Sequence, residues 1–245
     1  MDQLVINTTI STLVGVIGTG IGGIISVLLV RPNKTLLDTL MGLTGGIMLS
    51  IVTFDLLPEA ENIGGIYIEI MGITIGVVVV LFIESVLNFN TNSLYKHNNR
   101  FLKTGIIMGT GIAIHNFPEG LAIGAGLTFT IEMGIKVAIL MAFHNIPEGM
   151  AMGTPLRISG FSKLKVFFFT LLAGIPTGIG AFIGTLLGNI SDKFIAFCLS
   201  LAGGAMLYII IDEIIPTSKD RKNNKLSSIG FLLGLMLGLI IIGNL

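Results

Sequence analysis

Long apolar segments separated by short polar ones dominate the pattern along the chain. A helix that crosses the hydrocarbon core of a bilayer needs about 20 mainly apolar residues. Eight segments meet this requirement, and they run approximately over residues 8–30, 36–58, 64–87, 104–129, 133–156, 166–190, 194–215 and 226–244. The pattern predicts an all-α polytopic membrane protein whose eight transmembrane helices form a single domain, residues 1–245, in a lipid bilayer.

The composition agrees with this prediction. Of the 245 residues, 52% are hydrophobic and 11% are charged, whereas soluble domains carry about 25% charged residues. The formal net charge is zero, so nothing indicates nucleic acid as a partner. One cysteine, Cys198, excludes an intrachain disulfide and a four-cysteine zinc site. The N-terminus has no basic region before the first apolar segment, which argues against a cleaved signal peptide.

Basic residues in alternate connections predict the orientation, because Lys and Arg gather on the cytoplasmic side. Twelve of the 14 basic residues fall on one side of the eight spans, and the other two are Lys136 and Lys193. We therefore expect both termini outside, with the basic connections in the cytoplasm and the chain in the plasma membrane. The outer side gathers acidic residues that would concentrate cations or simply be solvated.

A ten-residue pattern occurs twice, 29 positions apart, inside the fourth and fifth predicted helices. Residues 115–124 read HNFPEGLAIG and residues 144–153 read HNIPEGMAMG. Ionisable side chains at membrane depth are costly unless they face a partner, a cavity or an ion. Each copy is therefore a candidate site.

Helix geometry places the ionisable residues of each copy together. Residues i and i+4 share a face, so His115 is expected over Glu119 and His144 over Glu148. Pro118 lacks an N–H and should kink its helix and free backbone carbonyls, and the proline of the second copy should do the same. Imidazole and carboxylate ligands without thiolate suit zinc, and iron, manganese or cobalt stay open as alternatives.

Two further interpretations accompany the metal site. The four side chains could instead form a polar network between kinked helices, but two buried glutamates would repel each other without a cation. Asn116 and Asn145 either offer carbonyl oxygens to the metal or cap freed backbone groups, and the sequence favours neither role.

A second repeat links the two ends of the chain. GGIML at residues 45–49 precedes Asp55 and Pro58, and GGAML at residues 203–207 precedes Glu213 and Pro216 at the same spacing. These repeats lie in the second and seventh helices, which cross in opposite directions. Helices 1–3 and 6–8 are therefore predicted to be an inverted repeat around the central pair, as in many transporters. Asp55 and Glu213 are candidate residues of a transport path, or else interfacial carboxylates without a further role. Met48 and Thr177 are weaker candidates, and for Met48 gap-filling is the favoured interpretation.

Two His-Asn-x-Pro-Glu-Gly copies on adjacent membrane helices resemble the ZIP family of divalent metal transporters. The resemblance implies transport of Zn²⁺ into the cytoplasm, with Fe²⁺, Mn²⁺, Co²⁺ or Cd²⁺ as other candidate substrates, and a homodimer. It implies a metal site of His115, Asn116, Glu119, His144, Asn145 and Glu148. Many relatives carry a glutamate on the sixth helix where this chain has Thr177, and some carry an acid at Asn145, so we expect one principal metal.

Two other classes of function compete with a transporter. A zinc protease helix would read His-Glu-x-x-His and a di-iron bundle Glu-x-x-His, and neither pattern occurs here. The chain is therefore not expected to be an enzyme. A membrane protein that senses metal without moving it would not need an inverted repeat. If neutral imidazoles bind the metal, transport should weaken as pH falls through the histidine range.

Overall fold

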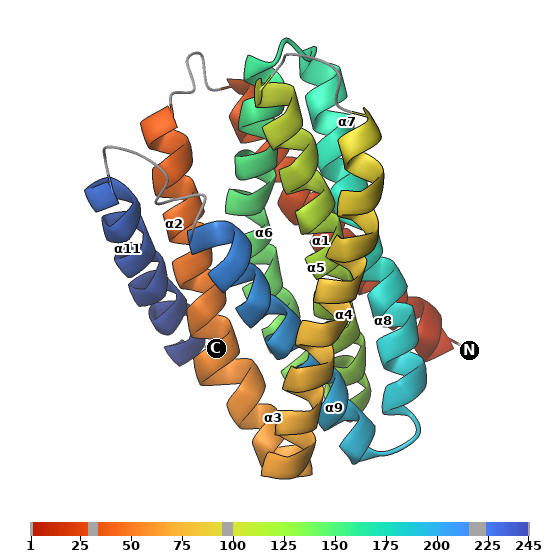
Figure 1. The fold of residues 1–245 in the computed structure, drawn as a ribbon. Coiled ribbons are helices and arrows are strands. Elements are labelled where there is room, and N and C mark those ends of the chain that lie inside the picture. Colours follow the sequence, from red (N-terminus) through yellow and green to blue (C-terminus); the bar gives the residue numbers. More distant parts are fainter. Residues whose placement is uncertain (1, 29–33, 95–99, 216–223, 245) are drawn as a thin grey trace.

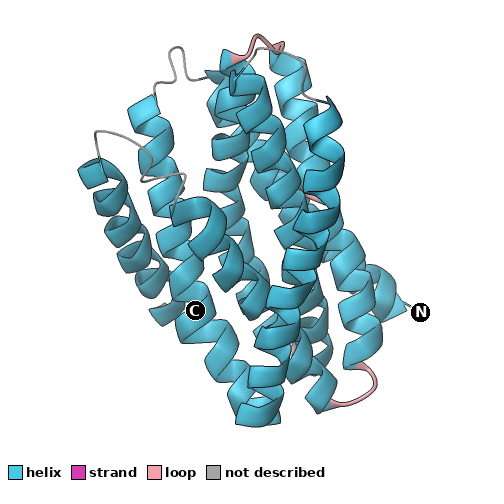
Figure 2. Cartoon of the chain, viewed as in Figure 1, coloured by secondary structure: helices cyan, strands magenta, loops and turns pink. Residues whose placement is uncertain are grey.

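A computed structural model describes residues 2–28, 34–94, 100–215 and 224–244, and within these ranges the chain is helical with no strand. The elements are α1 (Asp2–Leu28), α2 (Lys34–Ile51), η1 (Val52–Leu56), α3 (Leu57–Gly64), α4 (Ile66–Leu94), α5 (Arg100–Phe129), α6 (Ile131–Ile158), α7 (Lys163–Ala173), α8 (Ile175–Gly188), α9 (Asp192–Ile209), η2 (Ile210–Ile214) and α11 (Asn224–Gly243). They pack as one bundle of long helices with short connections (Figures 1 and 2).

Each of the eight predicted spans corresponds to one passage through this bundle, so the predicted fold is confirmed. The second passage consists of α2, η1 and α3, the sixth of α7 and α8, and the seventh of α9 and η2. The bounds differ from the predicted ones at several ends. The first helix already begins at Asp2, and α3 extends past the proline to Gly64. Apolar composition located the spans, whereas polar end turns made the helices longer.

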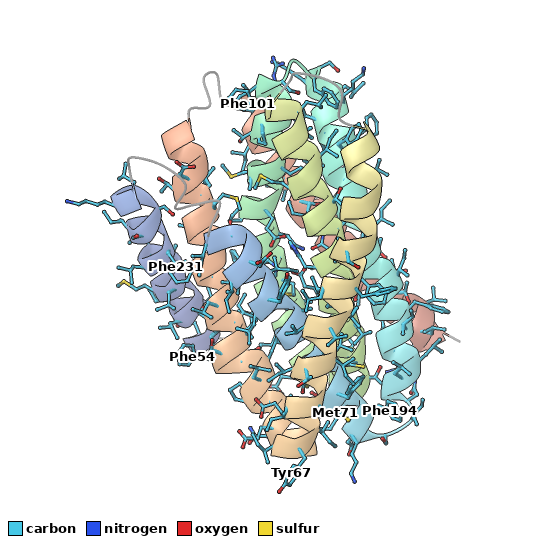
Figure 3. All side chains as sticks on the ribbon, viewed as in Figure 1. Phe54, Tyr67, Met71, Phe101, Phe194 and Phe231 are labelled. Atoms are coloured by element: carbon cyan, nitrogen blue, oxygen red, sulfur yellow. The ribbon has the colours of Figure 1, made fainter. Side chains whose placement is uncertain are left out.

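Within the described ranges, five helical segments are long and apolar enough to cross a membrane by length and composition: Gln3–Leu28, Asp38–Gly64, Lys163–Gly188, Asp192–Asp212 and Lys225–Gly243. The helices α5 and α6 are more polar because they carry the two His-Asn-x-Pro-Glu-Gly motifs. Large apolar side chains cover the outside of the bundle; Tyr67 is 87% exposed, and Phe54 and Met71 are about half exposed (Figure 3). Such a surface suits lipid, and the chain is a multi-pass membrane protein.

The two ends of the bundle differ in charge. The basic end, at the top of Figure 1, carries the connection between α6 and α7, with Arg157, Lys163 and Lys165. The acidic end, at the bottom, carries α3 and the start of α6, with Glu59 and Glu132.

Two π-helical turns occupy equivalent positions of the predicted repeat. In η1 the Leu57 N–H donates to the Val52 carbonyl, and in η2 the Ile215 N–H donates to the Ile210 carbonyl, one residue further back than in an α-helix. Pro58 follows η1 and has no N–H, so the α-helical ladder cannot continue there and a wider turn accommodates the proline. The sequence repeat predicted equivalent positions but not this conformation.

Glycine contacts confirm the repeat at constant register. The α-carbon of Gly46 packs against the Phe231 carbonyl, where a Cβ would lie 2.0 Å from the oxygen, and Gly204 packs in the same way against Ile73. A shift of 158 positions converts Gly46 into Gly204 and Ile73 into Phe231. The α2–α11 pair therefore repeats as the α9–α4 pair. These pairs run in opposite directions in Figure 1, as an inverted repeat requires.

The contacts between helices divide the bundle into two units. The site unit contains α1, α5, α6 and α8, and the wall unit contains α2 with η1, α3, α4, α9 and α11. In the site unit, α5 packs mainly on α8, and α6 mainly on α1. In the wall unit, α2 with η1 packs mainly on α11, and α9 with α3 mainly on α4. The units meet where α5 faces α9 and α6 faces α2, over an apolar core that includes Met48, Ile51 and Met206. The first and sixth passages thus join the central pair rather than staying with their own triplets.

Candidate metal site

The motif residues lie near the middle of α5 and α6, which pack side by side. His115, Glu119, His144 and Glu148 are at most 3% exposed. Both helices continue through their motif prolines, Pro118 and Pro147. Four ionisable side chains are therefore enclosed inside the site unit, where they need either one another or a ligand.

The closest contacts run between the helices. His115 Nε2 lies 2.9 Å from Glu148 Oε1, and His144 Nε2 lies 2.7 Å from Glu119 Oε1. Within α6, His144 Nε2 lies 3.8 Å from Glu148 Oε1. The expected i,i+4 neighbours do share a face, but each histidine is closest to the glutamate of the other helix. The antiparallel crossing of α5 and α6 brings these partners together.

These spacings are close to those of a metal coordination shell. Ligand atoms about 2.0–2.1 Å from a tetrahedral zinc ion lie roughly 3.3 Å from one another. Ligand atoms of His115, Glu119 and Glu148 lie within 4.8 Å of one another. The second carboxylate oxygens of Glu119 and Glu148 have no hydrogen-bond partner among the described residues. Small side-chain rotations would let these residues and His144 share one ion.

The two asparagines of the motifs differ in their surroundings. Asn116 Nδ2 donates to the Ala173 carbonyl at 2.7 Å, which caps the break between α7 and α8. Neither amide atom of Asn145 has a hydrogen-bond partner within the part of the chain that the structure describes, although the residue is fully buried. Asn116 thus has a structural role that leaves its amide oxygen available, whereas Asn145 has polar atoms that nothing else satisfies.

The motif glycines allow the neighbouring backbones to approach the site. A Cβ at Gly120 would lie 1.8 Å from the Thr177 carbonyl oxygen, and one at Gly149 would lie 2.1 Å from that of Thr19. Each glycine directly follows a site glutamate, so α8 and α1 pack against the turns that hold the carboxylates. The small residue at this position is therefore explained by close backbone contact.

Comparison with known proteins identifies the family of this chain. The family model described as ZIP Zinc transporter matches residues 90–243, which include both motifs, η2 and α11. The chain belongs to the ZIP family.

Full-length relatives extend the match to the first helices. The chain is 28% identical to a Clostridium perfringens protein named zinc transporter ZupT, over 92% of this chain and 91% of the relative. It is 30% identical to the ZupT of Corynebacterium glutamicum (91% and 93% covered) and 29% identical to zinc transporter ZTP29 of Arabidopsis thaliana (92% and 89% covered). ZIP proteins are transporters, so the expectation that the chain is not an enzyme is confirmed.

In this ZIP chain a cavity of about 100 Å³ reaches the site from the basic end. His115 and Glu148 form its polar part, and apolar residues of both units form the rest: Met41, Met108, Ile112, Ala151, Ile209 and Ile214, with Thr44. Towards the acidic end, Met48, Ile51, Leu140 and Met141 are at most 1% exposed within one apolar cluster. The cavity thus lies on the basic-end side of the ligands, whereas buried apolar side chains fill the acidic-end side.

The candidate path residues lie at different distances from the site. Met48 is fully buried in the closed apolar layer. Thr177 is buried with its hydroxyl against Gly15 of α1. Asp55 lies in η1 beside a second cavity near the acidic end. Glu213 belongs to η2, and its side chain lies outside the described part of the chain. Roles in transport stay predictions for all four.

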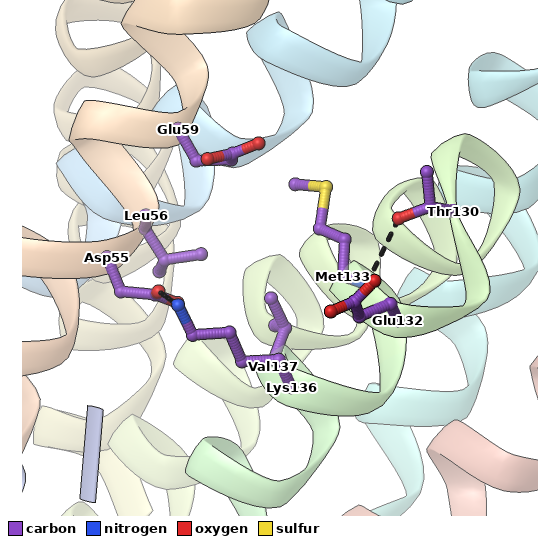
Figure 4. A pocket seen from close by; sticks show the side chains of 8 residues that line it. All are labelled: Asp55, Leu56, Glu59, Thr130, Glu132, Met133, Lys136 and Val137. Carbon is purple, nitrogen blue, oxygen red and sulfur yellow. Dashed lines mark hydrogen bonds and ion pairs between the residues drawn. The ribbon is translucent and has the colours of Figure 1, made fainter. Parts of the chain in front are cut away.

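One residue near the path was not identified from the sequence. Lys136 Nζ lies 2.5 Å from Asp55 Oδ1, across the boundary between α6 and η1 (Figure 4). The available signal was that Lys136 is one of two basic residues on an otherwise acidic side. Sequence periodicity could not show that a residue of the fifth helix reaches the second.

Proposed function

We propose that this chain carries divalent cations, zinc first, through a site formed by His115, Glu119, His144 and Glu148. The observation that carries the proposal is the enclosure of two imidazoles and two carboxylates, from adjacent helices, at ligand spacing. The carboxylates supply the two negative charges that a divalent cation requires, and imidazole favours zinc over magnesium or calcium. The names of the relatives support zinc as the substrate.

Alternating access is the proposed mechanism. All four ligands belong to the site unit, whereas residues of both units line the cavity and close the opposite side. A displacement of one unit against the other would therefore carry the bound ion between the two ends of the bundle. Inverted repeats support such exchange because each half can adopt the conformation of the other.

The distribution of basic residues supports uptake into the cytoplasm. With the basic end in the cytoplasm, the cavity beside the ligands would face the inside, and we expect both termini outside and the chain in the plasma membrane. Reagents that do not cross membranes should then modify cysteines introduced at the acidic end of intact cells. The family resemblance also favours a homodimer, which light scattering in detergent would measure.

Zinc uptake into proteoliposomes tests the proposal. We expect the unmodified protein to accumulate zinc, and His144→Gln and Glu119→Gln to lose uptake while they remain folded. Ser200→Ala is the matched control, because this hydroxyl is equally buried but donates within α9 and lies in the wall unit. Iron, manganese, cobalt and cadmium as competitors would order the substrates. A protein that binds zinc in detergent but moves none would contradict the proposed function.

A further inference from the structure

The ion pair between Lys136 and Asp55 lies at the acidic end of the interface between the two units. Lys136 extends from α6 across to η1, and the Asp55 side chain is 9% exposed against 33% for Lys136 (Figure 4). The pair borders a cavity of about 230 Å³ that Glu59 and Glu132 also line. A partly buried ammonium group therefore lies at the mouth that a cation would enter from this end.

The pair joins elements that would move relative to each other. Lys136 belongs to the site unit and Asp55 to the wall unit. Just beneath the cavity, Ile51 and Met141 close the way to the metal ligands. Separation of the units at this end would break the ion pair, so the pair stabilises the arrangement in which the acidic end is closed.

The internal repeat places no basic residue at the position equivalent to Lys136. The shift of 158 positions relates Asp55 to Glu213, and the shift of 29 positions relates Lys136 to Ile107. An isoleucine cannot form an ion pair, so the symmetric counterpart of this contact is absent from the sequence. The cavity that reaches His115 and Glu148 lies on the side of that other end.

This asymmetry bears on the balance between the two states. If the halves of an inverted repeat were identical, the states open to either side would have equal free energy, because a two-fold rotation in the membrane plane would convert one state into the other. A contact formed in only one state shifts the population towards that state. The Lys136–Asp55 pair is such a contact.

We propose that the Lys136–Asp55 ion pair is the gate of the acidic end, which an arriving divalent cation opens by displacing Lys136 from Asp55. Carboxylate oxygens are ligands for divalent cations, and Asp55 can bind either the ammonium group or the ion through the same oxygen. Lys136, already one-third exposed, then turns towards water. The gate presupposes the alternating access proposed above.

Cysteine accessibility in detergent tests the gate without any transport measurement. All variants carry Cys198→Ala, so that the introduced cysteine is the one thiol that a reagent can modify. Met141→Cys reports opening of the acidic end, and Met108→Cys reports opening of the basic end, where Met108 lines the cavity. Lys136→Met removes the charge and keeps the length of the side chain, and Lys136→Arg keeps the charge.

We expect Lys136→Met to speed modification at position 141 about fivefold, the population change that roughly 1 kcal/mol produces, and to slow it at position 108. Lys136→Arg should resemble the parent. Zinc should speed modification at position 141 in the parent but have little further effect after Lys136→Met.

Asp55→Asn provides the second approach, because it removes the other partner and should give the same shift. Combination with Lys136→Met should add nothing. Unchanged modification at both positions, in variants that melt like the parent and bind zinc, would overturn the gate. Failure of the parent to move zinc while modification still responds to Lys136→Met would instead contradict the proposed transport.

Discussion

The proposed ligands of the site unit and the buried serines of the wall unit differ in their hydrogen bonding. In the site unit, Glu119, Glu148 and Asn145 keep polar atoms that have no hydrogen-bond partner among the described residues. In the wall unit, Ser50 and Ser200 are as deeply buried, but their hydroxyls donate to carbonyls of their own helices. The site unit thus places polar atoms without partners around the proposed ion position, whereas these two serine hydroxyls are satisfied within their own helices.

The largest expected effect is a loss of zinc affinity in a variant of the site unit but not in a variant of the wall unit. His144→Ala removes a ligand and should weaken zinc binding by at least about 100-fold, the upper range for loss of an outer partner of a metal ligand. Ser200→Ala should leave the affinity unchanged. Competition with a fluorescent zinc chelator measures both. Equal losses in the two variants would contradict the assignment of the chemistry to one unit.

Packing should make the units equally sensitive to added volume at their glycine contacts. Gly120→Ala in the site unit and Gly46→Ala in the wall unit both place a methyl group within 2.0 Å of a backbone oxygen, and each should lower the unfolding free energy by about 1–3 kcal/mol. Gly243→Ala is the control, since nothing lies within 4 Å of its Cβ position. Thermal melting in detergent measures all three. If Gly46→Ala melted at the same temperature as the parent, α2 and α11 would pack more loosely than α5 and α8.

The two asparagines sharpen the comparison within the site unit. Asn116→Ala leaves the Ala173 carbonyl without its donor and should cost about 1–3 kcal/mol of stability. Asn145→Ala removes atoms without partners, so stability should hold while zinc affinity falls. Melting and zinc titration of each variant distinguish the two roles. Lower stability without loss of affinity in Asn145→Ala would count against its role as a ligand.

The smallest expected effect concerns Cys198 in the wall unit. Its thiol is fully buried against apolar neighbours, so thiol reagents should not modify the folded protein, and Cys198→Ala should retain zinc affinity and uptake. Mass spectrometry after incubation with a maleimide measures the modification. Rapid labelling of the native protein would show that the wall unit opens locally.

Much of the fold was predictable because the bilayer restricts the chain to long apolar helices. The eight spans, the tandem motif and the inverted repeat follow from composition and spacing, and the contacts of Gly46 and Gly204 repeat in the predicted register. The helix ends and the π-helical turns were not predictable in the same way. They depend on backbone hydrogen bonds around Pro58, which hydropathy does not register.

The sequence by itself determined which residue types are available for metal binding and that His115, Glu119, His144 and Glu148 share helix faces in pairs. Only the tertiary structure decided that His115 meets Glu148 and His144 meets Glu119, that Asn116 caps another helix, and that Lys136 reaches Asp55. The physical reason is that helical periodicity fixes the direction of a side chain around its own axis. The partner that it meets depends on how neighbouring helices cross, and close glycine contacts far apart in the sequence set that crossing.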